Sequence, residues 1–153
     1  MPSLAVLLGL LGLIPFLLCG IGAVGTNDPT ASAMAAALLG YGAVVLAFLG
    51  AVHWGMAMAP GTRFQTQRLA WGVVPALIGW AALVLDRLAP NAVALAVLIF
   101  GFLGAMGMET QAARAGLLPR GYLAWRWAVT AGAVTILTLV LILRVFGIRP
   151  FDI

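Results

Sequence analysis

The sequence predicts an all-α fold, a polytopic membrane helix bundle with five transmembrane helices. Two observations predict this class. Hydrophobic residues make up 64% of the 153 residues and charged residues only 8%, whereas a soluble domain is about half apolar and a quarter charged. The apolar residues also gather in five stretches, each meeting or approaching the roughly 20 residues that cross about 30 Å of hydrocarbon. Membrane β-strands would be about ten residues long with strict alternation, so a barrel is excluded.

We expect a single transmembrane domain over residues 1–153. The first span contains Pro15, which predicts a kink because proline removes a backbone donor and clashes with the preceding turn. A neighbouring residue must then satisfy the freed carbonyl, since lipid cannot. Turn residues over 25–30 separate this span from the next. The five spans are expected at about residues 4–24, 33–59, 69–85, 92–108 and 122–146.

The second span holds the stretch YGAVVLAFLGAVHWGMAMA and ends at residues 60–63, Pro-Gly-Thr-Arg. The third is the shortest; it carries Pro75 and ends at Asp86 and Arg87. The fourth passes into a polar helical extension over residues 109–114. The fifth opens with Trp-Arg-Trp at 125–127, which is typical of an interface anchor.

Glycines recur at a spacing of three residues on two spans. They are Gly101, Gly104 and Gly107 on the fourth span, and Gly9 and Gly12 on the first. Small residues let helix backbones approach closely. We interpret these patterns as support for a compact bundle.

The distribution of arginine predicts an orientation. Five spans place the two termini on opposite sides of the membrane. The side of the amino terminus carries five arginines, and the other side carries three: Arg63, Arg68, Arg114, Arg120 and Arg126 against Arg87, Arg144 and Arg149. The positive-inside rule then favours a cytoplasmic amino terminus and an external carboxyl terminus. Because these arginines flank apolar segments, we interpret them as topology signals and exclude nucleic-acid binding.

His53 is the sharpest candidate for function. It lies inside the second span, near the cytoplasmic face, and an ionisable residue within a membrane suggests a functional site by default. A histidine with an ordinary pKa of about 6.5 is suited to relaying protons, ligating a metal or bonding a quinone oxygen. The competing interpretation is an interhelical hydrogen bond with a purely structural role. One histidine without clustered ligands makes a poor metal site.

Three charged residues are expected on the same side as His53. Glu109 ends the fourth span, Arg126 begins the fifth and Arg68 begins the third. Together they predict a polar cluster at one depth, in which pairing would relieve the cost of desolvation. The competing interpretation places all three charges in the headgroup region.

Four tryptophans are expected near the cytoplasmic interface. An aromatic belt is the ordinary explanation, and an aromatic-lined pocket for a quinone or a lipid headgroup beside His53 is the alternative. These tryptophans are Trp54, Trp71, Trp125 and Trp127.

The sequence contains no nucleophile elbow, P-loop, dinucleotide fingerprint, haem-attachment motif or HExxH. We therefore expect no cofactor and no metal, and nothing in the residues calls for catalysis.

Several stretches resemble the domain of unknown function 3429, a family of small integral membrane proteins found in proteobacteria and in mitochondria. They are LGLIPF within residues 10–16, YGAVVLAFLGAVHWG at 41–55, RLAWGVVPALIGW at 68–80 and ARAGLLPRGYLAWR at 113–126. The AVHWG-type motif is the most specific part, although this chain has Gly-Ala-Val at 50–52 where relatives often have a glycine pair before the histidine. The resemblance implies a bacterial inner (cytoplasmic) membrane or a mitochondrial setting. It carries no established activity.

Two functions are compatible with these features. The first is a non-catalytic accessory or assembly subunit of a larger inner-membrane complex, respiratory or photosynthetic, with lipids and other membrane subunits as partners. Small size and glycine-rich helices favour it. The second is a small carrier or ligand-binding protein for a quinone, a lipid or a proton-coupled solute, which would use His53, Glu109 and Arg126.

Overall fold

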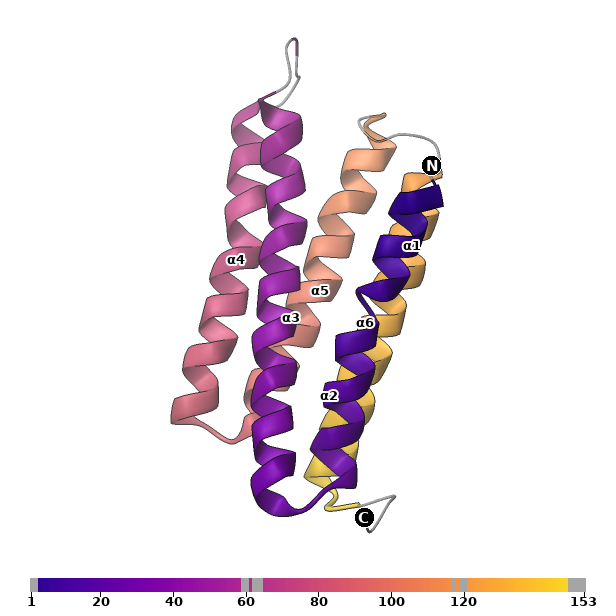
Figure 1. Cartoon of the computed structure of the whole chain (residues 1–153). Helices are drawn as coiled ribbons and strands as arrows, with labels where there is room; N and C mark the ends of the chain where they lie inside the picture. Colours follow the sequence, from indigo (N-terminus) through magenta and orange to yellow (C-terminus); the bar gives the residue numbers. More distant parts are fainter. Residues whose placement is uncertain (1–2, 59–60, 62–64, 117, 119–120, 149–153) are drawn as a thin grey trace.

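The chain forms an all-helical bundle in the computed structural model, which describes residues 3–58, 61, 65–116, 118 and 121–148. Five helical stretches are long and apolar enough to cross a membrane, with α1 and α2 together forming the first. The predicted fold class is therefore confirmed. The described helices are α1 (Ser3–Leu11), α2 (Ile14–Gly25), α3 (Asp28–Ala57), α4 (Gln65–Leu88), α5 (Asn91–Arg114) and α6 (Tyr122–Val145), shown in Figure 1.

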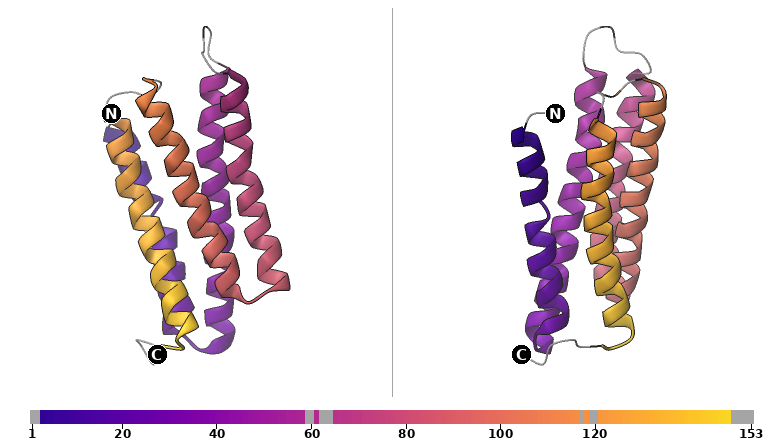
Figure 2. Two further views of the ribbon diagram at one scale, coloured as in Figure 1. Left: turned by 180° about the vertical axis from the view of Figure 1, so that it is seen from behind. Right: turned by 90° about the vertical axis from the view of Figure 1, so that its right-hand side faces the viewer.

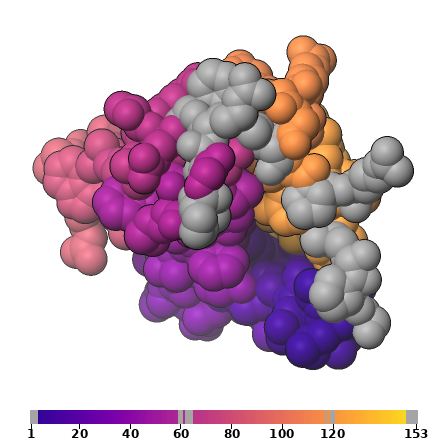
Figure 3. Space-filling view, turned by 90° about the horizontal axis from the view of Figure 1, so that it is seen from above, coloured from indigo at the N-terminus to yellow at the C-terminus, as the bar shows by residue number. Residues whose placement is uncertain are grey.

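The helices run side by side and alternate in direction (Figures 1 and 2). The amino ends of α1, α4 and α6 and the carboxyl ends of α3 and α5 lie at one end, the upper end in Figure 1. Seen from that end, α3 lies between α4 on one side and the α5–α6 side on the other (Figure 3). The upper end is where the sequence predicted the polar cluster. Three arginines used in the orientation argument, Arg63, Arg120 and Arg149, lie outside the described residues.

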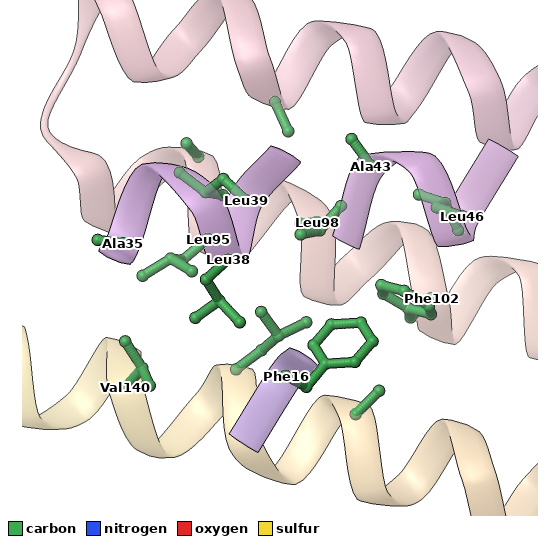
Figure 4. Packing of buried hydrophobic residues seen from close by; sticks show 14 of the residues in the cluster. Phe16, Ala35, Leu38, Leu39, Ala43, Leu46, Leu95, Leu98, Phe102 and Val140 are labelled. Atoms are coloured by element: carbon green, nitrogen blue, oxygen red, sulfur yellow. The ribbon is translucent and has the colours of Figure 1, made fainter. Parts of the chain in front are cut away.

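The core forms where α2, α3, α5 and α6 meet. Phe16, Leu38, Leu98 and Leu137 are almost completely buried there, and Figure 4 shows Phe16 and Leu38 turned toward the same region as Val140. Large apolar side chains also cover the outside of the bundle, as a hydrocarbon solvent requires. Because lipid is as apolar as this core, the helices are held together by close packing and polar contacts rather than by exclusion of water.

The first span is broken rather than merely kinked. Gly12 and Leu13 form a turn between α1 and α2, and Pro15 occupies the first turn of α2. The break precedes the proline because the pyrrolidine ring clashes with the carbonyl one turn earlier. The Tyr41 hydroxyl of α3 donates a 2.9 Å hydrogen bond to the Gly12 carbonyl. A side chain of a neighbouring helix thus satisfies a backbone carbonyl at the break, because lipid offers no hydrogen-bond donor.

Helices α3 and α4 make the closest contact in the bundle. A Cβ atom added to Gly50 would overlap the Gly72 carbonyl oxygen, and one added to Gly79 would lie 3.0 Å from the Ala43 carbonyl oxygen. The Trp54 indole also donates a 2.9 Å hydrogen bond to the Leu69 carbonyl across this contact. Pro75 is buried, and α4 continues through it as one helix.

The three glycines of the fourth span differ in their surroundings. Gly101 packs against α3 and α4, where an added Cβ would lie 2.6 Å from a Leu46 methyl carbon. Gly104 and Gly107 are exposed and have no side-chain or neighbouring-helix atom within 4 Å of an added Cβ. The reason is helical geometry: each step of three residues falls about 60° short of a full turn. The later glycines therefore rotate away from the core.

Candidate polar site

The four candidate polar side chains, each from a different helix, lie at the upper end of the bundle. His53 lies near the end of α3, Arg68 in the first turn of α4, Glu109 in the last part of α5 and Arg126 near the start of α6. His53, Arg68 and Glu109 are 2%, 6% and 2% exposed. We call these four residues the polar cluster. From the sequence we expected them at one depth, and in the structure they lie at the same end of the bundle.

Glu109 and Arg126 form a two-pronged ion pair. The Arg126 Nε lies 3.0 Å from Oε2 and 3.2 Å from Oε1 of Glu109, and Nη2 lies 3.1 Å from Oε1. The Glu109 side chain is 3% exposed and the Arg126 side chain is 12% exposed. Paired N–H donors matched to two carboxylate oxygens make a strong, directional contact. The bundle therefore encloses these two charges.

His53, on α3, is buried against α4. Its ring meets Trp71 edge-on, with 6.1 Å between ring centroids and 86° between ring planes. Its Nδ1 atom is buried and has no hydrogen-bond partner among the described residues. The charges of Glu109, Arg68 and Arg126 all act on the ring.

Arg68 is a buried cation that lacks a carboxylate partner in the described residues. Its Nε is also buried without a hydrogen-bond partner there. Among the described residues, Glu109 is the only acid near the upper end, because Asp28 begins α3 and Asp86 lies near the end of α4, both at the lower end. The fourth acid, Asp152, follows α6 and lies outside the described residues. The polar cluster therefore combines two guanidinium groups with one carboxylate.

The four tryptophans divide into two kinds. Trp54 and Trp127 are exposed, at 43% and 48%, as an aromatic belt requires. Trp71 packs against His53, and the Trp125 ring covers Gly9 of α1, where an added Cβ would lie 2.8 Å from Cζ2. Trp71 and Trp125 are only partly exposed. Neither of these contacts could be assigned from the sequence, because each joins residues on different helices.

The lower end carries polar contacts of a different kind. Arg144 Nη1 donates a 3.0 Å hydrogen bond to the Ala23 carbonyl in the last turn of α2, and Asn91 donates a 2.8 Å bond to Asp86. The Arg144 side chain also lines a cavity of about 160 Å³ beside Thr26. This cavity lies far from the polar cluster. Among the described residues, no three His, Cys, Asp or Glu side chains gather in a way that would hold a metal.

Comparison with known proteins identifies the family of the chain. The profile described as "Protein of unknown function (DUF3429)" matches residues 1–142. The chain belongs to this family. All four residues of the polar cluster fall within the stretch that matches the DUF3429 profile.

The chain is also similar to Transmembrane protein 69 of Xenopus tropicalis, with 38% identity over 87 residues. This alignment covers 54% of the chain and 33% of that relative, so the chain spans about one third of the relative's length. No solved structure matches the chain. The five candidate spans and this likeness make the DUF3429 chain a multi-pass membrane protein.

Proposed function

We propose that this DUF3429 protein is a non-catalytic accessory or assembly subunit of a larger respiratory or photosynthetic complex in the bacterial inner membrane. We place its amino terminus in the cytoplasm, following the excess of arginine on that side. In this role the bundle contributes packing surface and stability to other membrane subunits, and it transforms no substrate.

The outer face of α5 carries this proposal. Phe100, Leu103, Gly104 and Gly107 are all exposed, and their spacing of i, i+3, i+4 and i+7 places them on one side of the helix. An open surface surrounds the two glycines. Exposed glycine on a transmembrane helix allows another helix to approach its backbone closely, which favours association by packing. We call these four residues the α5 face.

A pull-down from native membranes in a mild detergent tests the proposal. The tagged chain is expected to retain other membrane subunits, identified by mass spectrometry. The double variant Gly104→Leu, Gly107→Leu is expected to lose them, because the leucines fill the space that a partner helix needs. Gly55→Leu is the matched control, since Gly55 is also an exposed, open position but lies on α3. Recovery of the wild-type chain only by itself would rule the proposal out.

A second function is favoured by the unpartnered atoms of the polar cluster. His53 Nδ1 and Arg68 Nε are buried polar atoms without partners in the described residues, and such atoms cost free energy unless something bonds them. They support a small carrier or ligand-binding protein for a quinone, a lipid or a proton-coupled solute. A His53→Ala variant should then lose the cellular phenotype at normal expression. A fully retained phenotype would count against this second function.

A further inference from the structure

We propose that the polar cluster binds the phosphate group of an anionic phospholipid through Arg68, with His53 as the second donor. This inference rests on the second proposed function, ligand binding at the polar cluster, and it needs no partner complex.

The charge balance of the site calls for an anion. Glu109, the one carboxylate at the upper end among the described residues, is already held by three N–H···O contacts from Arg126. Arg68 remains as a cation that is 6% exposed. A buried charge without a counterion is strongly unfavourable. A phosphate supplies the missing negative charge, whereas the neutral carbonyl of a quinone does not.

The two unpartnered atoms match phosphate oxygens in chemistry. Arg68 Nε always carries a proton, and guanidinium groups bind phosphate through paired N–H donors. His53 Nδ1 donates in the tautomer that carries its proton there. Both atoms are buried in residues at least nine-tenths enclosed, and they come from α3 and α4, which are locked together beside them by the bond from Trp54 to Leu69.

The depth of Arg68 points to a lipid as the source of the phosphate. Arg68 lies in the first turn of α4, after the exposed polar residues Gln65, Thr66 and Gln67. Such a segment suits the level of the lipid headgroups. The positive end of the α4 dipole adds to the attraction for an anion.

Thermal unfolding of the purified full-length chain in detergent tests the inference. The probes are phosphatidylglycerol, phosphatidylcholine, inorganic phosphate and a short-chain ubiquinone, each titrated separately. Phosphatidylglycerol should raise Tm in a saturable way, because a ligand that binds only the folded state stabilises it. Arg68→Gln should weaken the apparent affinity for this lipid about tenfold or more, which is the scale of one charge-assisted contact.

The control is Arg114→Gln, which removes an exposed arginine in the last turn of α5 at the same end. It should leave the lipid affinity within about twofold, since exposed pairs contribute little. If Arg68→Gln does not fold, Arg68→Lys is compared with Arg114→Lys instead. Lysine keeps the charge but lacks Nε and the paired donors, so the Arg68 variant should still bind more weakly.

Five results would overturn the inference. Equal losses in the Arg68 and Arg114 variants would show general attraction to the headgroups, and an equal response to phosphatidylcholine would show no preference for an anion. Stabilisation by inorganic phosphate without a response to phosphatidylglycerol would exclude a lipid source. A response to ubiquinone alone, lost in His53→Ala, would overturn the phosphate assignment while leaving ligand binding intact. The absence of any response would overturn both.

Discussion

Glu109 and Arg126 illustrate how a single polar contact behaves inside a membrane bundle. Neither side chain has ready access to water, so neither is solvated if its partner is lost. The contribution of this pair to stability is therefore best measured as the free energy of unfolding that is lost when one partner is removed. The same reasoning applies to Arg68 and His53, whose unpartnered atoms set the polar cluster apart from an ordinary interhelical contact.

Glu109→Gln should lower the free energy of unfolding by about 3 kcal/mol, because it leaves the Arg126 charge enclosed and unpaired. Arg126→Gln should have a similar effect. The double variant should cost clearly less than the sum, since both charges leave together. Denaturation in detergent measures all three free energies, with the exposed Arg114→Gln as a control. Simple additivity of the two single changes would contradict the ion pair.

The sequence predicted which polar residues lie at this end of the bundle, but not which residues they contact. A histidine and three charges at the ends of apolar segments were visible in the sequence, and so was their common side. The Glu109–Arg126 pairing was not, because Arg68 was an equally good partner by sequence. Which arginine pairs with the Glu109 carboxylate depends on α5 and α6 lying next to each other. That neighbourhood is a property of the tertiary structure.

At the level of the helices, glycine and proline decide where backbones meet and where they break. The contact between α3 and α4 depends on Gly50 and Gly72, which face each other with no space for a side chain. The break between α1 and α2 depends on Pro15 and on the Tyr41 hydroxyl that satisfies Gly12. The sequence indicated an interruption at Pro15. The pairing of Gly50 with Gly72 could not be predicted, because glycines are common on every span and periodicity does not say which helices are neighbours.

Gly72→Ala should destabilise the bundle by about 1–3 kcal/mol, the usual cost of overpacking. The added methyl group would overlap the Trp54 ring and approach the Gly50 carbonyl oxygen. Gly55→Ala is the matched control: it adds the same methyl group to open space and should be neutral or slightly stabilising, because alanine favours helix. Thermal unfolding in detergent compares the two variants. An equal Tm for both would contradict the close contact between α3 and α4.

Tyr41→Phe should cost about 1 kcal/mol, the net value of a hydrogen bond whose acceptor is left unpaired. The ring contact with Phe16, at 5.1 Å between centroids, should remain. Limited proteolysis should also detect faster cleavage near Gly12, since the turn loses its tie to α3. Tyr41→Leu removes the ring as well and should be more destabilising than Tyr41→Phe. If Tyr41→Phe is as stable as the wild type, the hydroxyl does not hold the break.

The whole molecule is a bundle whose two ends differ. The upper end holds the polar cluster, and the lower end holds the bond from Arg144 to Ala23 and a small cavity. Composition alone was sufficient to predict five spans, because an apolar segment of this length has one stable form in lipid. The outward position of the α5 face could not be predicted, since it depends on which side of α5 the other helices cover.

Reporter fusions test the orientation of the whole bundle. The excess of arginine at the upper end predicts that this end faces the cytoplasm. A fluorescent protein at the amino terminus should therefore be bright, and alkaline phosphatase at the carboxyl terminus should be active. Phosphatase fused after Asn27, between α2 and α3, should be active as well. The opposite pattern would reverse the orientation and place the polar cluster on the outer side.

Photo-crosslinking in native membranes asks whether the α5 face packs against another membrane protein. A photoreactive amino acid is placed at Gly104 or Gly107 on that face, and at Val44 on α3 as a control, because Val44 is 66% exposed but lies on another helix. We expect a covalent adduct to a second, different polypeptide from positions 104 and 107 and none from position 44. Adducts to lipid alone, or to another copy of this chain alone, would contradict it.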